Sequence, residues 1–161
     1  MTDEDYMRLA IEEGKSATNQ GNWPIGCVIV LDGLVVAKGH NLVYSTDNRL
    51  AHAELIALEA AQPYIFKRLG EAIMYTTYEP CPMCFGAALN ARLKKVVYGV
   101  DLNGSGAVHL KDQLPELYIG GEYNTEFISG VLADECELLY QEGEVAVLSA
   151  RQALVNQANN K

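Results

Sequence analysis

The chain reads AHAELIALEAA at residues 51–61 and EPCPMC at residues 79–84, and these two segments decide its fold. The first segment is rich in good helix formers and is expected to end near Pro63. In the second segment, Pro80 disfavours helix in the residue before it, whereas Pro82 suits the first position of a new helix. Two helices are therefore predicted to begin beside two short sets of polar side chains.

These polar side chains are three potential metal ligands and one carboxylate. His52 and Glu54 fall in the first turn of the first helix, after a turn and cap segment at Thr46-Asp47-Asn48. Cys81 and Cys84 are spaced i, i+3 at the start of the second helix and share one face of it. The dipoles of two helix N-termini favour thiolates there, so the pattern predicts a metal between the two helix ends.

The number of ligands indicates what kind of metal site this is. A structural zinc usually has four protein ligands, whereas a catalytic zinc has three and leaves a position for water. His52, Cys81 and Cys84 make three, and no other cysteine or histidine has helpful local spacing. A Cys-x-x-Cys pair alone would also fit a redox pair or a structural zinc knuckle. Together with the upstream His-x-Glu, it predicts one catalytic Zn²⁺ per chain, with Glu54 as the proton-transferring residue.

The remaining pattern alternates strands and helices. Asp32-Gly33 is a strong hairpin signal between two apolar runs. We expect helices at 4–19, 83–91, 131–141 and 144–157, strands at 27–31, 34–37, 72–77, 95–100 and 124–129, and loops at 103–106 and 120–121. The order β-β-α-β-α-β up to residue 100 predicts an α/β fold with a mixed sheet.

Length and composition favour a single domain that spans residues 1–161. Hydrophobic residues make up 49% of the chain, yet no apolar run approaches the roughly 18 residues that span a bilayer. The acidic N-terminus lacks the features of a signal peptide, so we expect a cytoplasmic protein. Cys27 and Cys136 lie in apolar segments and are predicted to be reduced core residues.

The charge distribution argues against a large nucleic-acid surface. The net charge is −9, and residues 113–150 contain eight Asp or Glu and no Lys or Arg. Phosphate contacts carry most of the affinity of nucleic-acid-binding proteins, so these enzymes normally present a basic face. Basic residues do gather at 67–68 and 92–95, but solvated charges at helix ends are the favoured interpretation of these clusters.

The chain resembles the cytidine/deoxycytidylate deaminase superfamily, from about residue 7 to about residue 139. The His-x-Glu and Pro-Cys-x-x-Cys signature of zinc nucleobase deaminases carries this resemblance, supported by WPIG at 23–26, GHN at 39–41 and GVLADEC at 130–136. The branch concerned holds tRNA adenosine deaminases, guanine deaminases and fungal-type cytosine deaminases. The resemblance implies a three-layer α/β/α fold with a mixed five-stranded sheet, and a homodimer.

The resemblance also implies which residues bind the substrate. Asn41 matches the family position whose side chain contacts the base, although an Asn that ends a strand also suits a turn. Trp23, Pro24 and Ile25 match the pocket wall, with a core role as the alternative for Trp23. The backbone of Ala53 is expected to help orient the ring of the base.

Three functions compete. The acidic charge favours a zinc-dependent hydrolytic deaminase that acts on a free purine or pyrimidine base or nucleoside and releases ammonia. The alternative is a tRNA-specific adenosine deaminase that edits an anticodon adenosine to inosine, favoured by residues 130–136 but weakened by Asp101 and by a mostly uncharged segment at 150–155. A non-catalytic binding module is the remote third candidate, because all four residues of the signature are present.

Overall fold

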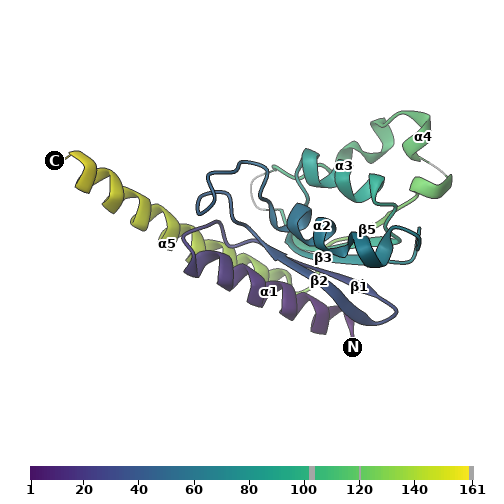
Figure 1. Cartoon of the computed structure of the whole chain (residues 1–161), viewed down its shortest axis with the longest axis horizontal. Helices are drawn as coiled ribbons and strands as arrows, with labels where there is room; N and C mark the ends of the chain where they lie inside the picture. The colour runs from purple at the N-terminus through teal and green to yellow at the C-terminus, as the bar shows by residue number, and fades with distance from the viewer. Residues whose placement is uncertain (102–103, 120, 160–161) are drawn as a thin grey trace.

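A five-stranded mixed sheet organises the computed structural model, which describes residues 1–101, 104–119 and 121–159 (Figure 1). The strand order is β2-β1-β3-β4-β5, with β1 antiparallel to β2 and β3, and with β3, β4 and β5 mutually parallel. The strands are β1 (Gly26–Leu31), β2 (Leu34–His40), β3 (Ile73–Tyr78), β4 (Lys95–Val100) and β5 (Glu126–Ile128). The mixed five-stranded sheet expected from the sequence is confirmed.

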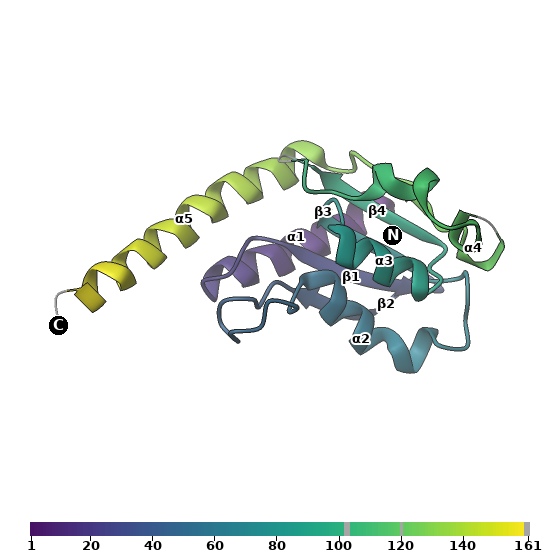
Figure 2. The same ribbon diagram turned by 90° about the horizontal axis from the view of Figure 1, so that it is seen from above.

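Helices cover both faces of this sheet (Figures 1 and 2). On one face, α2 (Ala53–Ile65) and α3 (Pro82–Asn90) bury residues such as Ala57 and Ala88 against Ile29 and Met74. On the other face lie α1 (Asp3–Asn19) and the first part of α5 (Ala133–Asn159). Because successive strand residues point to opposite faces, the apolar run of β1 is buried on both, which gives the three-layer α/β/α arrangement.

The pairing register of the strands brings the predicted site residues together at one end of the sheet. Gly26, the first residue of β1, pairs with His40 at the end of β2, and Cys27 pairs with Thr76 near the end of β3. The segment before β1, the residues after β2 and the residues after β3 therefore emerge together. These are the segments that contain the sequence-predicted pocket, base-contacting and cysteine residues.

Two of the expected helix boundaries need correction at α2. The helix begins at Ala53 with His52 as its N-cap, so the cap expected at Thr46-Asp47-Asn48 is wrong. It also continues past Pro63 to Ile65, because a proline in the last turn removes only one of the final helical hydrogen bonds. The second metal-bearing helix begins with Pro82 at its first turn, as expected.

The C-terminal region differs most from the expectation. A single helix, α5, replaces the two predicted helices, because Gly143 does not end it. A β-carbon at Gly143 would lie 2.5 Å from the Cβ of Pro24, so this glycine allows close approach of α5 to the segment before β1. Beyond that contact the helix projects from the body of the molecule (Figures 1 and 2).

Between β4 and β5 the structure has elements that the sequence did not predict. These are the 3₁₀ helix η1 (Val108–Gln113), the short helix α4 (Glu116–Ile119) and the 3₁₀ turn η2 (Gly121–Tyr123). Residues 104–106 form a loop, as expected, whereas residues 103 and 120 of the predicted loops lie outside the described residues. Cys27 and Cys136 are buried free thiols, as expected. No helix of the described part of the chain is long and apolar enough to cross a membrane.

Gly39 on β2 sets how closely α2 can approach the sheet. A β-carbon at this position would lie 2.4 Å from the carbonyl oxygen of Ala53 and 2.7 Å from the amide nitrogen of Ala57. Both contacts are with backbone atoms, which cannot rotate away. The start of α2, and with it His52, therefore depends on the missing side chain at residue 39.

We predict that Gly39→Ala lowers the free energy of unfolding by about 1–3 kcal/mol or more, because the overlap must displace α2. Gly86→Ala is the matched control: it lies inside α3, and its β-carbon would meet nothing within 4 Å. This control should gain roughly 0.5–1 kcal/mol from reduced chain entropy. Urea unfolding of the zinc-loaded proteins measures both changes, and equal stability of the two variants would contradict the packing argument.

Candidate metal centre and substrate cavity

Three side chains from two helix ends form a compact triangle. His52 is the N-cap of α2, Cys81 is the N-cap of α3, and Cys84 lies in the first turn of α3. The Nδ1 atom of His52 is 3.6 Å from the sulfur of Cys81 and 3.6 Å from the sulfur of Cys84. The three ligand atoms all lie within 4.8 Å of one another, so one ion could contact all three.

The dimensions of this triangle fit zinc. With Zn–N bonds of about 2.05 Å and Zn–S bonds of about 2.3 Å, the N and S atoms of a tetrahedral site are about 3.6 Å apart. That value matches the two measured N···S distances. The donor set of one imidazole and two thiolates is also the type that zinc prefers. The geometry and the chemistry of the ligands therefore agree with a zinc site that has three protein ligands.

The ionisation of the two thiols also indicates a site built for a cation. Hydrogen bonding from Cys84, aided by His52, lowers the pKa of Cys81 to about 3, so this sulfur is a thiolate. The same interaction with Cys81, together with burial, raises the pKa of Cys84 well above its usual range. One negative charge is thus shared between two adjacent sulfurs. A bound divalent cation would stabilise the second thiolate as well.

Glu54 is buried beside this triangle. Its side chain is 3% exposed, and its Oε2 atom accepts a hydrogen bond of 3.5 Å from the Cys84 thiol. Burial is the main cause that raises the pKa of this carboxyl above its usual value, and the charge of Cys81 acts in the same direction. A carboxyl group that gains and loses a proton easily, next to a metal, suits general acid–base chemistry.

His52, Cys81 and Glu54 line a small cavity of about 240 Å³. This volume lies below the roughly 300–1,000 Å³ of pockets for drug-sized ligands, so it suits one heterocyclic base. Nine residues from five segments line the cavity: Trp23, Ile25, His52, Glu54, Tyr78, Glu79, Cys81, Ser105 and Tyr140.

Aromatic rings form one wall of the cavity. The rings of Trp23 and Tyr140 are stacked, with centroids 6.1 Å apart and an interplanar angle of 6°. Tyr140 also packs against Tyr78, with a centroid distance of 5.1 Å. Flat apolar faces of this kind allow a purine or pyrimidine to stack next to the metal.

The sequence-predicted substrate residues take different places around the cavity. Trp23 and Ile25 line it, whereas Pro24 is buried against Gly143 of α5 and holds the wall from behind. Ala53 is fully buried at the first position of α2, where a helix amide has no intrahelical acceptor. Their roles toward substrate stay predictions.

Asn41 is not among the residues that line the cavity, and the structure shows its turn role. The side chain is 2% exposed, and its Oδ1 atom accepts a hydrogen bond of 3.2 Å from the Val43 amide. Its Nδ2 group has no hydrogen-bond partner among the described residues. The predicted contact of this residue with a base stays a prediction.

The sequence predicted the loop after β4, but not that this loop lines the cavity. The carboxylate Oε1 of Glu79 accepts a hydrogen bond of 3.0 Å from the Val108 amide, and the Ala107 amide donates to the Pro80 carbonyl at 3.0 Å. These bonds hold Ser105 at the cavity. Tyr140 was also missed, although it lies one helical turn after the buried Cys136, a spacing that places both on one face.

Comparisons with known proteins agree with this site. A family model described as the cytidine and deoxycytidylate deaminase zinc-binding region matches residues 1–100. A tRNA-specific adenosine deaminase of Bacillus subtilis is 41% identical over 136 residues, which cover 83% of this chain and 83% of the relative.

Two solved structures are also similar. A tRNA:A34 deaminase for A-to-I editing at the wobble position of transfer RNA has a TM-score of 0.72 and 31% identity, covering 84% of this chain and 98% of the other. The guanine deaminase of Bacillus subtilis has a TM-score of 0.60 and 32% identity, covering 71% of this chain and 79% of the other.

The fold and the cavity place this chain in the class of metal-dependent hydrolases. More narrowly, it belongs to the cytidine and deoxycytidylate deaminase family, whose zinc-binding region it contains. It is a hydrolase that acts on C–N bonds of nucleobases or nucleosides, with zinc as its cofactor.

We predict that the purified protein contains one zinc per chain and that Cys84→Ser or His52→Ala brings the zinc content near zero, because two ligands bind the ion poorly. Cys136→Ala is the matched control, since Cys136 is a buried free thiol outside the triangle. Atomic absorption on dialysed protein measures the content. Full zinc in the Cys84 variant would exclude this sulfur as a ligand.

Proposed function

We propose that this protein is a tRNA-specific adenosine deaminase, which converts an anticodon adenosine to inosine. The observation that carries the proposal is the 41% identity to the Bacillus subtilis tRNA-specific adenosine deaminase over most of both chains. The cavity supports it, because it admits a single base and has an aromatic wall. An enzyme that acts on one nucleotide of an RNA loop takes that base out of its stack and into such a pocket.

The residues around the cavity have complementary roles in this reaction. When bound by His52, Cys81 and Cys84, zinc supplies a water of lowered pKa as nucleophile at neutral pH. Glu54 would take one proton of the attacking water and give it to the ring nitrogen next to the amino-bearing carbon, as a C–O bond forms at that carbon. It would then carry the remaining hydroxyl proton to the amine, the C–N bond would break, and ammonia would leave.

Shielding from water favours this proton transfer. Glu54 is buried beneath the cavity, and the stacked rings of Trp23 and Tyr140 cover one side of it. A base held against this wall would displace solvent from the carboxyl group. The Nδ2 group of Asn41 can then donate to an acceptor on the base, while its Oδ1 keeps the turn at Val43 in place.

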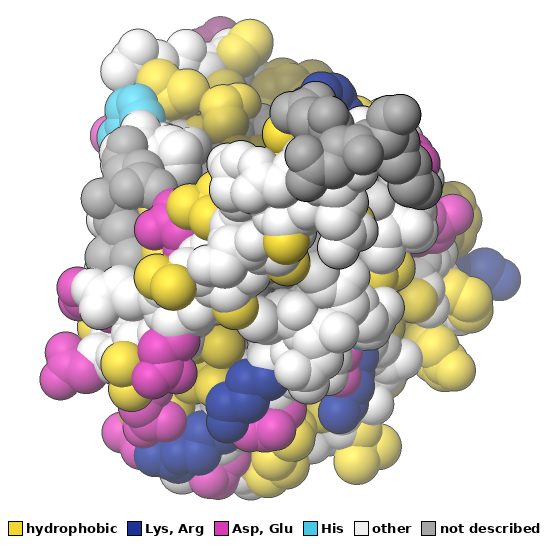
Figure 3. All heavy atoms as spheres, turned by 90° about the vertical axis from the view of Figure 1, so that its left-hand side faces the viewer, with side chains coloured by type: hydrophobic (Ala, Val, Ile, Leu, Met, Phe, Trp, Pro, Cys, Tyr) yellow, Lys and Arg dark blue, Asp and Glu magenta, His cyan; other side chains and the backbone are white. Residues whose placement is uncertain are grey.

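The acidic charge of the chain, which favoured a small-molecule substrate, is compatible with an RNA substrate if basic residues are well placed. On the face shown in Figure 3, Lys and Arg side chains lie mainly along the lower edge and alternate with Asp and Glu. Of the sequence-predicted basic cluster at 67–68, Arg68 is engaged by Asp32 and Glu71. We therefore propose that individual arginines close to the cavity supply RNA contacts.

A free-base deaminase is the second candidate, and one observation favours it. The Bacillus subtilis guanine deaminase is 32% identical to this chain and shares its fold. The two candidates differ in what lies outside the cavity, because a free base needs no phosphate contacts. The substrate is accordingly either an RNA or a free base. The homodimer that the resemblance implies stays a prediction.

We predict that Glu54→Gln keeps its zinc but deaminates an anticodon stem-loop at least about 100-fold more slowly, because a carboxamide cannot carry the proton between its two sites. Inosine formation in the RNA and zinc content are measured on the same preparations. Substantial inosine formation by the Gln variant would remove Glu54 from the mechanism. An active wild-type protein that leaves the stem-loop unchanged and deaminates guanine would instead refute the RNA substrate.

Asn41→Asp separates the turn role of this residue from its substrate role. The carboxyl oxygen still accepts from the Val43 amide, so the turn should persist, but burial of the new carboxyl group should lower thermal stability somewhat. The Nδ2 donor is lost, and we expect kcat/KM to fall about 10- to 100-fold, as when a hydrogen bond to a base is removed. Steady-state kinetics and thermal unfolding measure the two effects. Unchanged kinetics would assign Asn41 to the turn alone.

A further inference from the structure

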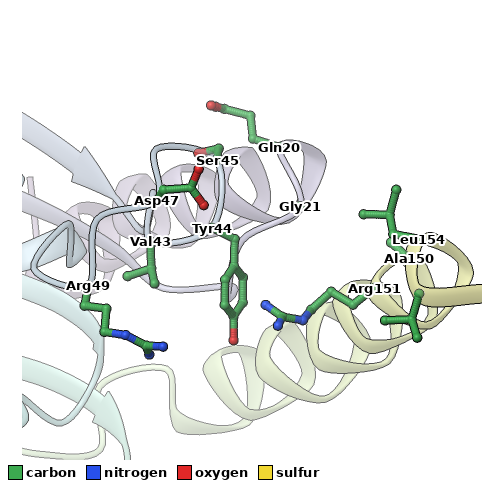
Figure 4. A pocket seen from close by; sticks show the side chains of 11 residues that line it. Gln20, Gly21, Val43, Tyr44, Ser45, Asp47, Arg49, Ala150, Arg151 and Leu154 are labelled. Carbon is green, nitrogen blue, oxygen red and sulfur yellow. The ribbon is translucent and has the colours of Figure 1, made fainter. Parts of the chain in front are cut away.

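A second pocket is linked to the substrate cavity through a hydrogen bond between one lining residue of each. This outer pocket, of about 570 Å³, is bordered by the loop of residues 43–49 and by residues 150–155 of α5 (Figure 4). Trp23 connects the two spaces: it lines the substrate cavity, and its Nε1 group donates a hydrogen bond of 3.0 Å to the hydroxyl of Tyr44, which lines the outer pocket. Directly contacting residues therefore line the two spaces.

The outer pocket is held in place by a buried polar residue. The side chain of Asn22 is fully buried, and its Oδ1 accepts hydrogen bonds from the amides of Tyr44 at 2.8 Å and Ser45 at 3.0 Å. Its Nδ2 donates to the hydroxyl of Ser45 at 2.9 Å. These bonds fix the loop from beneath, so Tyr44 is presented without the entropy cost of ordering a mobile loop on binding.

Two arginines approach Tyr44 from opposite sides of this pocket. The guanidinium of Arg151 on α5 lies over the Tyr44 ring, 3.8 Å from its centroid, and Arg49 points toward the same region from the loop (Figure 4). Among the described residues neither arginine has a carboxylate within ion-pair distance, whereas Arg8 and Arg68 are both paired. In a chain of net charge −9, two unneutralised guanidinium groups at one pocket form a local positive field.

The chemistry of these groups defines the ligand. Guanidinium groups bind phosphate through two parallel hydrogen bonds, and a tyrosine ring in the same pocket gives a face or edge for a base or sugar. Asp47 also lines the pocket and would repel an anion, but as an acceptor it suits a ribose hydroxyl. Phosphate, ribose and base together describe one nucleotide.

We propose that the outer pocket binds the nucleotide next to the target nucleoside, with Arg49 and Arg151 contacting its phosphate. This inference rests on the proposed RNA substrate, and it names the residues that distinguish an RNA strand from a free base. It also gives a role to Arg151, which is an isolated charge in the otherwise uncharged segment 150–155.

The test is direct binding of an anticodon stem-loop to zinc-loaded protein that carries Glu54→Gln, so that the RNA is not turned over. Arg49→Gln and Arg151→Gln are added separately to this background. Fluorescence anisotropy at several salt concentrations should show binding weakened by about tenfold or more for each variant. The slope of log K against log salt should also become shallower by about 0.7, the value for one phosphate contact on a single strand.

Two further variants control for effects on the fold. Arg8→Gln removes an exposed arginine on α1 and should leave both affinity and slope unchanged. Arg151→Lys keeps the charge but not the planar stack on Tyr44, so it should keep most of the salt slope. Because Arg49 lies in the loop rather than on α5, its variant reports on the phosphate even if Arg151→Gln shifts the helix.

Replacing single phosphates of the stem-loop by neutral methylphosphonates identifies the contact. At one position beside the target adenosine, the substitution should weaken binding as much as Arg49→Gln does, and the two changes together should cost no more than either alone. If the wild-type protein forms inosine in the RNA but the arginine variants keep its affinity and salt slope, the inference about the outer pocket is overturned and the proposed function stands. A wild type that neither binds nor edits the stem-loop would overturn the proposed function and the inference with it.

Discussion

The meeting of two helix N-termini at one metal site is the constraint on which the rest of the structure depends. N-cap residues normally use their side chains to satisfy the first free amides of a helix. Here the caps of α2 and α3 are His52 and Cys81, and neither makes such a bond. Both side chains turn toward each other instead. The metal that fits between them thus ties together two helices that pack on the same face of the sheet, and the position of Glu54 follows from the start of α2.

The sheet supplies the rigidity that this arrangement needs. Because β1 is antiparallel to β2 and β3, the segments before β1 and after β2 and β3 reach the same edge. Gly39 allows α2 to lie directly on β2. The cavity residues next to β1, β2 and β3 are thereby anchored by strands of the sheet, while the loop after β4 is held by Glu79. Rigid support of this kind keeps proton-transferring groups at the correct distance and angle from a bound base.

The sequence predicted the metal triangle, a carboxyl group beside it and all five strands of the described sheet, because these follow from local spacing and apolar runs. It was less successful where distant segments decide the outcome. Two helices were predicted at 131–141 and 144–157, yet α5 is one continuous helix in which Gly143 lies in close contact with Pro24. Arg151 reaches the outer pocket because that helix is continuous, and Tyr140 reaches the cavity because the first part of the helix packs beside the segment before β1. No local pattern reveals this, since the contacts join residues that are far apart in the chain.

The acidic net charge predicted a free base or nucleoside as substrate, whereas the proposed substrate is a tRNA. Net charge is a property of the whole chain, whereas recognition depends on the charges that lie close to the cavity. The most direct test of the account is a competition in which wild-type protein receives an anticodon stem-loop and free guanine at equal concentrations. The account predicts that inosine accumulates in the RNA while guanine is left intact. Conversion of guanine to xanthine, with an unchanged stem-loop, would contradict it.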